Sequence, residues 1–207
     1  MAFEMTVITE GKLQLTFQPG WQAAQIDRTA WYREGTAIGS RVKAMDVTAF
    51  GPGGHWWIEV KDCVGYEKVN LPRLAVDPPS QVKDTQAWVE SKGWQHLVEA
   101  KRAKMFVADE VLQKVAGTIV TLTAASRAPA TDARAAAVQP YAGAYAPDTS
   151  WTVVVLLTWD RKDYGRLASL LTTALKQRLH AFNVSCMVIN EFHTAPPLPW
   201  QVVRSAP

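Results

Sequence analysis

The feature that most constrains the fold is an unbroken apolar run, WTVVVLLT, at residues 151–158. Such a run is typical of a strand that is covered on both faces of a sheet. Asp160 then provides an N-cap for a helix that is predicted to continue to about His180. The apolar face of this helix is expected to comprise Tyr164, Leu167, Leu171 and Leu175. Residues 183–190 (NVSCMVIN) again resemble a buried strand, so the order strand, helix, strand predicts a parallel pair joined by a right-handed crossover.

A β-hairpin is predicted upstream of this unit. Residues 41–50 (RVKAMDVTAF) and 56–64 (WWIEVKDCV) have strand-like patterns, and Gly51-Pro52-Gly53-Gly54 forms a turn signal between them. On the second strand, alternation places Trp57, Glu59 and Lys61 on one face. The face of the first strand that includes Asp46 is expected to comprise Val42, Ala44, Asp46, Thr48 and Phe50. We therefore expect an α/β fold, with a mixed central sheet that is flanked by helices and whose hairpin edge joins a parallel portion.

Weaker patterns predict the other elements of a single domain that spans residues 1–207. Residues 13–17 (LQLTF) alternate and precede a Pro-Gly turn, which predicts a short strand. Helical spacing of apolar residues predicts three helices, at residues 21–34, 84–101 and 107–124. Residues 70–80 contain three prolines and are expected to be a loop, and the Ala- and Pro-rich segment 125–150 a long loop or an insertion. The proline-containing tail is expected to run extended over the surface.

Composition limits the classes of protein that need to be considered. The 207 residues include 22 basic and 19 acidic side chains, and the net charge of +3 permits a nucleic-acid partner without requiring one. Because the chain has no apolar stretch of about 18 residues, we expect no membrane association. The N-terminus lacks the pattern of a secretory signal, and Cys63 and Cys186 are expected to be buried and reduced. A cytoplasmic location is therefore expected.

Several common catalytic motifs are not supported by the sequence. The turn at Gly51–Gly54 is not followed by GK[ST], so a hairpin turn is favoured over a phosphate-binding loop. His96, His180 and His193 do not have the spacing of metal ligands, and two cysteines are too few to assemble a zinc site. We expect His55 to be a surface residue of the turn, with a role as a base or ligand as the alternative. No Ser-His-Asp arrangement can be argued from spacing.

The unusual feature is the presence of charged residues in an apolar strand. Glu59 and Lys61 alternate with bulky residues in WWIEVK, and such charges are costly to bury unless they are paired or bind a metal. Asp46 is expected to lie across the hairpin on the same face. Two converging carboxylates form a hard-oxygen site suited to Mg²⁺, and the ammonium of Lys61 can neutralise a phosphate or hold a water molecule.

Asp46, followed after the hairpin by Glu59-Val60-Lys61, resembles the active-site motif of the PD-(D/E)XK phosphodiesterase superfamily. The string VKAMDVTAF…WWIEVKD looks especially like a bacterial branch of that superfamily whose second motif strand reads IEVKD. The resemblance implies a restriction-endonuclease-like fold and a metal-dependent nuclease that hydrolyses phosphodiester bonds. DNA is the expected substrate, and a bacterial defence or DNA-processing system is the expected setting.

The resemblance also implies roles for individual residues. Asp46, Glu59 and the backbone carbonyl of Val60 would bind Mg²⁺ or Mn²⁺, and Lys61 would position the nucleophile. The helix after the motif often carries an auxiliary polar residue, for which the candidates are Gln113 and Lys114. A homodimer, or association with a partner protein of a multi-component system, is implied as well.

The chain departs from the family pattern at two positions. Met45 precedes Asp46, where proline is common. Many members carry an acid in the first helix, and only Asp27 and Glu34 are available here, neither at a convincing position. A third acidic ligand is therefore not established by the sequence.

Other interpretations remain open. Glu59 and Lys61 could form an ion pair on a solvated face, without a metal. Lys101, Arg102 and Lys104 form a basic cluster on a predicted helix, which is either a solvated face or a contact for DNA phosphates. The chain could instead be an inactive nuclease-like module that binds nucleic acid or a protein, or an assembly subunit that docks through its Ala/Pro-rich segment.

Overall fold

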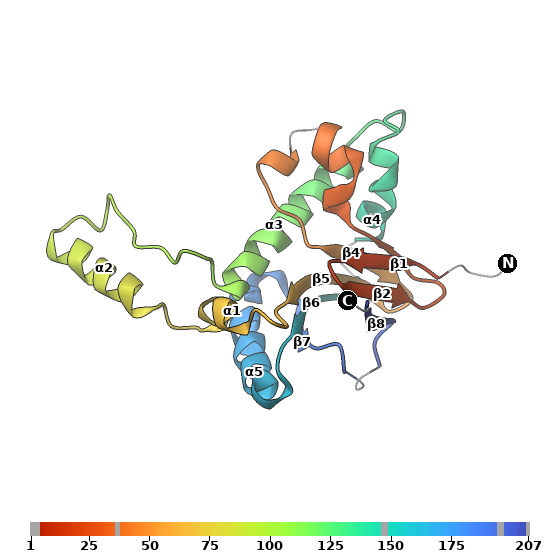
Figure 1. Ribbon diagram of the computed structural model, residues 1–207. Coiled ribbons are helices and arrows are strands. Elements are labelled where there is room, and N and C mark those ends of the chain that lie inside the picture. Colours follow the sequence, from red (N-terminus) through yellow and green to blue (C-terminus); the bar gives the residue numbers. More distant parts are fainter. Residues whose placement is uncertain (1–4, 36–37, 146–148, 194–196, 206–207) are drawn as a thin grey trace.

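The computed structural model describes residues 5–35, 38–145, 149–193 and 197–205. Its centre is a mixed five-stranded sheet with the order β3-β4-β5-β6-β7 (Figure 1). These strands span Gln22–Ala24, Val47–Gly51, Gly54–Asp62, Trp151–Thr158 and Ser185–Ile189. The pairs β3–β4 and β4–β5 are antiparallel, whereas β5–β6 and β6–β7 are parallel. The expected α/β fold with a mixed sheet flanked by helices is confirmed at this level.

The strand–helix–strand unit agrees closely with its prediction. All eight residues of β6 are buried, as expected for a strand with both faces covered. Helix α5 spans Arg161–Arg178, and the Asp160 side chain caps it by accepting a hydrogen bond from the Lys162 backbone N–H at 3.0 Å. Strand β7 then pairs parallel to β6, as predicted.

The hairpin β4–β5 is also present, but its first strand is shorter than predicted. Gly51 pairs with Gly54 across a two-residue turn, and Gly54 adopts a φ of +102° that favours glycine. Strand β4 begins only at Val47, because the preceding residues pack on helix α3 (Val107–Ser126) instead of pairing with β5. The Met45 backbone N–H donates to the Thr118 hydroxyl of α3 at 2.9 Å, which diverts the chain from the sheet before Asp46.

The two faces of the central sheet are covered differently. Helices α3 and α5 pack on the face that carries Trp57 and Val155. A second, antiparallel sheet with the order β1-β2-β8 packs on the opposite face (Figure 1). Phe17 of this sheet belongs to the same buried cluster as Ile58 and Leu156 of the central sheet. The strands of the second sheet span Val7–Glu10, Leu13–Phe17 and Trp200–Arg204. Strand β2 was predicted, whereas β8 lies in the tail that was expected to run extended over the surface.

The predicted helix at residues 21–34 is wrong. Its first part is strand β3, in which Ala23 pairs with Ala49, and the remainder forms a 3-10 turn (Ile26–Arg28) and a short π-helix (Trp31–Gly35). Another 3-10 turn spans Ile38–Ser40. Trp21 and Ala23 are both buried, so tertiary pairing follows the alternating pattern of this segment and overrides the helical one.

Other boundaries also differ from prediction. Part of the predicted loop 70–80 belongs to helix α1 (Glu67–Leu74), and α2 (Ser80–Ser91) is shorter than the helix predicted at 84–101. Gly93, at a φ of +70°, follows the end of α2. Segment 125–150 is not purely a loop, because it contains a 3-10 turn (Ala135–Ala137) and helix α4 (Gln139–Ala144). A last 3-10 turn spans His180–Phe182.

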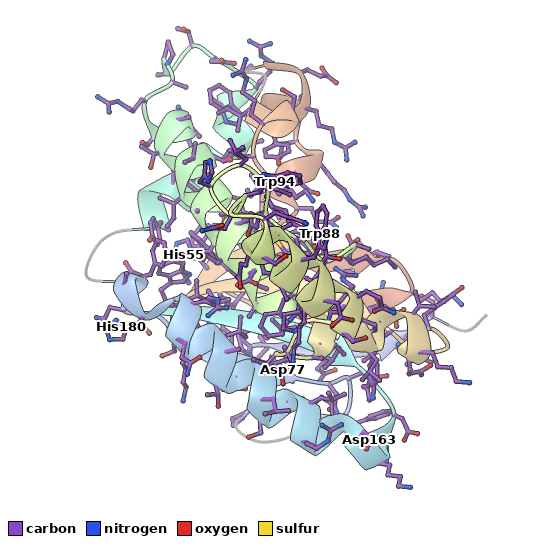
Figure 2. All side chains as sticks on the ribbon, turned by 90° about the vertical axis from the view of Figure 1, so that its left-hand side faces the viewer. His55, Asp77, Trp88, Trp94, Asp163 and His180 are labelled. Carbon is purple, nitrogen blue, oxygen red and sulfur yellow. The ribbon has the colours of Figure 1, made fainter. Side chains whose placement is uncertain are left out.

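Helix α2 and the loop after it project from the body of the molecule (Figure 1). Trp88 and Trp94 lie together on this projection, with their ring centroids 5.5 Å apart, and both are about half exposed (Figure 2). Among the described residues, no helix combines the length and apolar character needed to cross a membrane.

Candidate functional site

The structure brings Asp46 and Glu59 together at the point where β4 begins. The pairing of Val47 with Ile58, continued by one residue, places Asp46 opposite Glu59. The Val60 backbone N–H donates to Asp46 Oδ2 at 2.8 Å, which fixes this carboxylate at the edge of β5. In a strand the carbonyl of a residue points to the same side as its N–H, so the Val60 carbonyl also faces the Asp46 side.

Lys114 of α3 connects the two carboxylates. Its Nζ lies 2.7 Å from Asp46 Oδ1 and 2.7 and 2.8 Å from the two oxygens of Glu59. The Thr118 hydroxyl, one turn further along the helix, donates to the Lys114 carbonyl and accepts from Met45. The helix is therefore fixed against the residue that precedes Asp46, and Lys114 is directed into the site.

Lys61 lies on the same face of β5 and completes an ion-pair network. Its Nζ is 2.6 Å from Glu59 Oε1 and 3.1 Å from Glu110 Oε1 of α3. Glu110 in turn contacts Arg73 of α1 at 2.5 Å. The Glu59 side chain is fully buried, and that of Lys61 is only 11% exposed. The three residues of the predicted motif thus converge, although two members of the network, Glu110 and Arg73, were not anticipated.

Burial and the neighbouring charges together set the pKa values of this cluster. Burial, and then the charge of Asp46, raise the pKa of Glu59 from 4.5 to about 7, against the opposing influence of Lys61 and Lys114. Burial alone would lower the pKa of Lys114, but Glu59 and Asp46 together raise it above its ordinary value. For Glu110, burial acts to raise the pKa, but Lys61 and Arg73 outweigh it and lower the pKa. The site therefore holds two firmly charged groups around one carboxylate that titrates near neutrality.

A cavity of about 550 Å³ adjoins this cluster and is lined by Lys114, Glu110, Lys43, Tyr32 and Asp27, among others. Asp27 Oδ1 is buried without a hydrogen-bond partner among the described residues. Burial, and then the charge of Asp46, raise the pKa of Asp27. Asp27, for which the sequence alone supported no role as a third acidic ligand, thus lies close enough to interact with Asp46 and Lys114. In the sequence, Asp27 is marked only by following the apolar residue Ile26, which the structure shows to be buried.

The donor set fits a hard divalent cation. Asp46 Oδ1 and both oxygens of Glu59 already converge on one positively charged nitrogen. Within the described part of the chain no group of three or more His, Cys, Asp or Glu side chains is arranged to hold a metal. Mg²⁺ commonly uses one or two protein carboxylates and retains several waters, so two carboxylates and a backbone carbonyl suffice.

Further candidates from the sequence are Glu34, Gln113 and Lys104. Glu34 is exposed and contributes nothing to the described ion-pair network. Gln113 and Lys104 line a smaller cavity of about 240 Å³, together with Glu110, Arg73 and Lys43.

The basic cluster of residues 101–104 is not a helical face, because α2 ends at Ser91. Lys101 pairs with Glu99 at 3.1 Å. Arg102 donates to the carbonyls of α1 and the residues after it, those of Pro72, Ala75 and Val76. Arg102 is thus committed to holding the end of α1, so two of the three basic residues already have intramolecular partners.

The expectation that His55 is a surface residue is wrong. His55 is buried, stacks on Phe50, and accepts a hydrogen bond from Trp57 Nε1 at 3.3 Å. Tyr145, directly after α4, packs against the same imidazole and so covers this part of the hairpin. Burial lowers the pKa of His55 to about 4, which keeps the ring neutral. The two cysteines are buried and free, as expected.

Comparisons of this chain with protein-family models, curated proteins and solved structures find no match.

Proposed function

We propose that the chain is a metal-dependent phosphodiesterase that hydrolyses nucleic acid, with DNA as the expected substrate. The observation that carries the proposal is the convergence of Asp46 and Glu59 from adjacent strands on one cationic position, with Lys61 on the same face. Paired carboxylates of this kind are costly to bury unless a cation lies between them. The hairpin followed by two parallel strands supports placing the fold with the restriction-endonuclease-like proteins.

The chemistry follows from the positions of these groups. Asp46, Glu59 and the Val60 carbonyl would hold Mg²⁺ or Mn²⁺, which when bound polarises a phosphoryl oxygen and lowers the pKa of a bound water. Lys61 lies within 2.6 Å of Glu59 Oε1, so its ammonium stands beside the place where water and phosphate would meet. There it can orient the attacking water and stabilise the negative charge that develops on the phosphate.

Basic residues around the two cavities support a polyanionic substrate. The larger cavity is lined by Arg33 and Lys43, and the smaller one by Lys43, Arg73 and Lys104. Lys43 and Glu110 line both cavities, so the two adjoin. Cationic side chains at such positions bind phosphates and release counterions, which makes affinity dependent on salt. A dimeric state and a role in bacterial defence are part of the same proposal and rest on the motif resemblance, whereas a cytoplasmic setting is proposed from the two free cysteines.

Cleavage by point variants tests this function. Purified protein is incubated with double- and single-stranded DNA in Mg²⁺ or Mn²⁺, and Lys61→Ala is compared with Lys83→Ala. Lys83 is a matched control, because its side chain is 54% exposed and pairs only loosely with Asp77 among the described residues. We expect Lys61→Ala to lose about 100-fold or more in rate, and Lys83→Ala to cleave like the wild type. Equal rates for the two variants, or no cleavage and no metal binding by the wild type, contradict the proposal.

A second candidate function is that of an inactive module that binds nucleic acid. It is favoured by the ion pairs themselves, since Lys61 and Lys114 already neutralise Asp46 and Glu59 without a metal. This alternative predicts salt-sensitive DNA binding that Asp46→Asn leaves unchanged, and no uptake of Mn²⁺. Isothermal titration with Mn²⁺ separates the two functions before any cleavage is measured.

A further inference from the structure

Lys114 occupies the position that a bound cation would need. Its Nζ lies 2.7 Å from Asp46 Oδ1 and 2.7 and 2.8 Å from the oxygens of Glu59, so three carboxylate oxygens surround one nitrogen. Lys61 is placed differently, because its Nζ lies between Glu59 and Glu110. Only one of the two ammonium groups therefore stands between Asp46 and Glu59.

We propose that Lys114 is an exchangeable internal counter-ion, which neutralises Asp46 and Glu59 in the metal-free protein and leaves them when a divalent cation binds. The inference rests on the proposed function and adds a regulatory step to it. A cation and an ammonium cannot share one position between two carboxylates. The loss of the Lys114 ion pairs therefore makes metal binding less favourable.

The structure provides a place for the displaced side chain. Lys114 lines the cavity of about 550 Å³, and its side chain is 12% exposed. Asp27 lines the same cavity, and its Oδ1 is buried without a hydrogen-bond partner among the described residues. If the Lys114 ammonium leaves Asp46 and moves into the cavity, it can therefore pair with the carboxylate of Asp27 instead. The helix need not move, because Thr118 holds the backbone of Lys114 and not its side chain.

Binding of Mn²⁺ alone tests the exchange without reference to catalysis. Isothermal titration compares the wild type with Lys114→Met, which keeps an unbranched side chain of nearly the same length and removes its charge. We expect Lys114→Met to bind Mn²⁺ about tenfold tighter or more, since a difference of about 1.4 kcal/mol is sufficient for that factor. We also expect Mn²⁺ to raise the melting temperature of Lys114→Met more than that of the wild type. Lys61→Met is the matched control and should show a smaller gain in affinity.

The outcomes separate this inference from the proposed function. If the wild type binds Mn²⁺ and Lys114→Met binds it equally or more weakly, the exchange is refuted and the phosphodiesterase proposal stands. If neither protein binds Mn²⁺, both proposals fail. If only Lys114→Met binds Mn²⁺, the exchange is refuted, because the wild type then keeps Lys114 between the carboxylates and takes up no metal.

A measurement on the wild-type protein covers the case in which Lys114→Met does not fold. Lysines are acetylated with acetic anhydride, with and without Mg²⁺, and the extent at each position is read by mass spectrometry. We expect acetylation of Lys114 to rise several-fold with Mg²⁺, while the exposed Lys83 and Lys101 react equally in both conditions. Protection of Lys114 that persists when Mg²⁺ is bound overturns the inference.

Discussion

Glu59→Gln isolates the titration of the fully buried carboxylate of the site. In the metal-free protein the pKa of Glu59 is raised from 4.5 to about 7, first by burial and then by Asp46. Unfolding returns this group to water and to its ordinary pKa. Between these two pKa values the unfolded chain releases a proton that the folded chain retains, so the free energy of unfolding falls as pH rises.

The size of the effect follows from the shift. A change from 4.5 to about 7 corresponds to about 3 kcal/mol of stability, which is present below the lower pKa and lost above the higher one. Glutamine is neutral over the whole pH range, so the Glu59→Gln variant does not lose this stability as pH rises. The unfolding free energy of Glu59→Gln, minus that of the wild type, should therefore increase by about 3 kcal/mol between about pH 4 and about pH 8.

Urea unfolding in EDTA, followed by tryptophan fluorescence over this pH range, measures the difference. Other acids with shifted pKa values are present in both proteins, so to first order their contributions cancel. Asp77→Asn makes the same change of charge at a side chain that is 87% exposed, and it is the matched surface control. If the unfolding free energy of Glu59→Gln minus that of the wild type stays constant or decreases as pH rises, the assignment of a raised pKa to Glu59 is refuted.

Two further predictions concern how α3 is held against the site. Gly117→Ala should destabilise the protein by about 2 kcal/mol or more in spite of its gain in helix propensity, because a Cβ there would lie 2.0 Å from a backbone carbonyl. Gly165→Ala, on open helix surface, should be neutral or stabilising by up to about 1 kcal/mol, and equal urea midpoints for the two variants would contradict the packing argument. Thr118→Val should cost about 1–3 kcal/mol, because it leaves the Met45 backbone N–H buried without its partner. Loss of amide-exchange protection at Met45 is the specific readout, and unchanged protection would count against the role of this hydroxyl.

The parts of the fold that sequence predicted well have strong local signals. Strand β6 matches its predicted bounds, because eight successive apolar or Thr residues leave no alternative to a strand with both faces covered. Helix α5 follows from the Asp160 cap, and the hairpin from its glycine-rich turn. In each case a few neighbouring residues determine the element.

Long-range pairing explains the failures. The segment after Trp21 has apolar residues at helical and at alternating spacing, and the pairing of Ala23 with Ala49 decides between them. Strand β8 follows a proline-containing segment and exists because it pairs with β2 from the opposite end of the chain. Neither pairing has a signal within a short window of sequence.

The residues of the candidate site also divide into those with a local sequence signal and those brought together only by the fold. Asp46, Glu59 and Lys61 could be selected because charges stand out in an apolar strand. Glu110 and Arg73 could not, because they lie on separate helices and each looks like an ordinary surface residue until the fold joins them. Lys114 was an auxiliary candidate from its approximate position alone, and its contact with both carboxylates required the structure.

Charge balance links the stability of the site to its proposed chemistry. With Glu59 ionised, the cluster contains three carboxylates (Asp46, Glu59 and Glu110) and three cations (Lys61, Lys114 and Arg73) in contact. Because this cluster is neutral, its burial does not require an additional cation. Adding a divalent cation to a set that is already neutral would leave excess positive charge, and releasing Lys114 from the pair reduces that excess. The ion pairs that neutralise Asp46 and Glu59 in the metal-free protein are therefore the ones that a bound metal would have to displace.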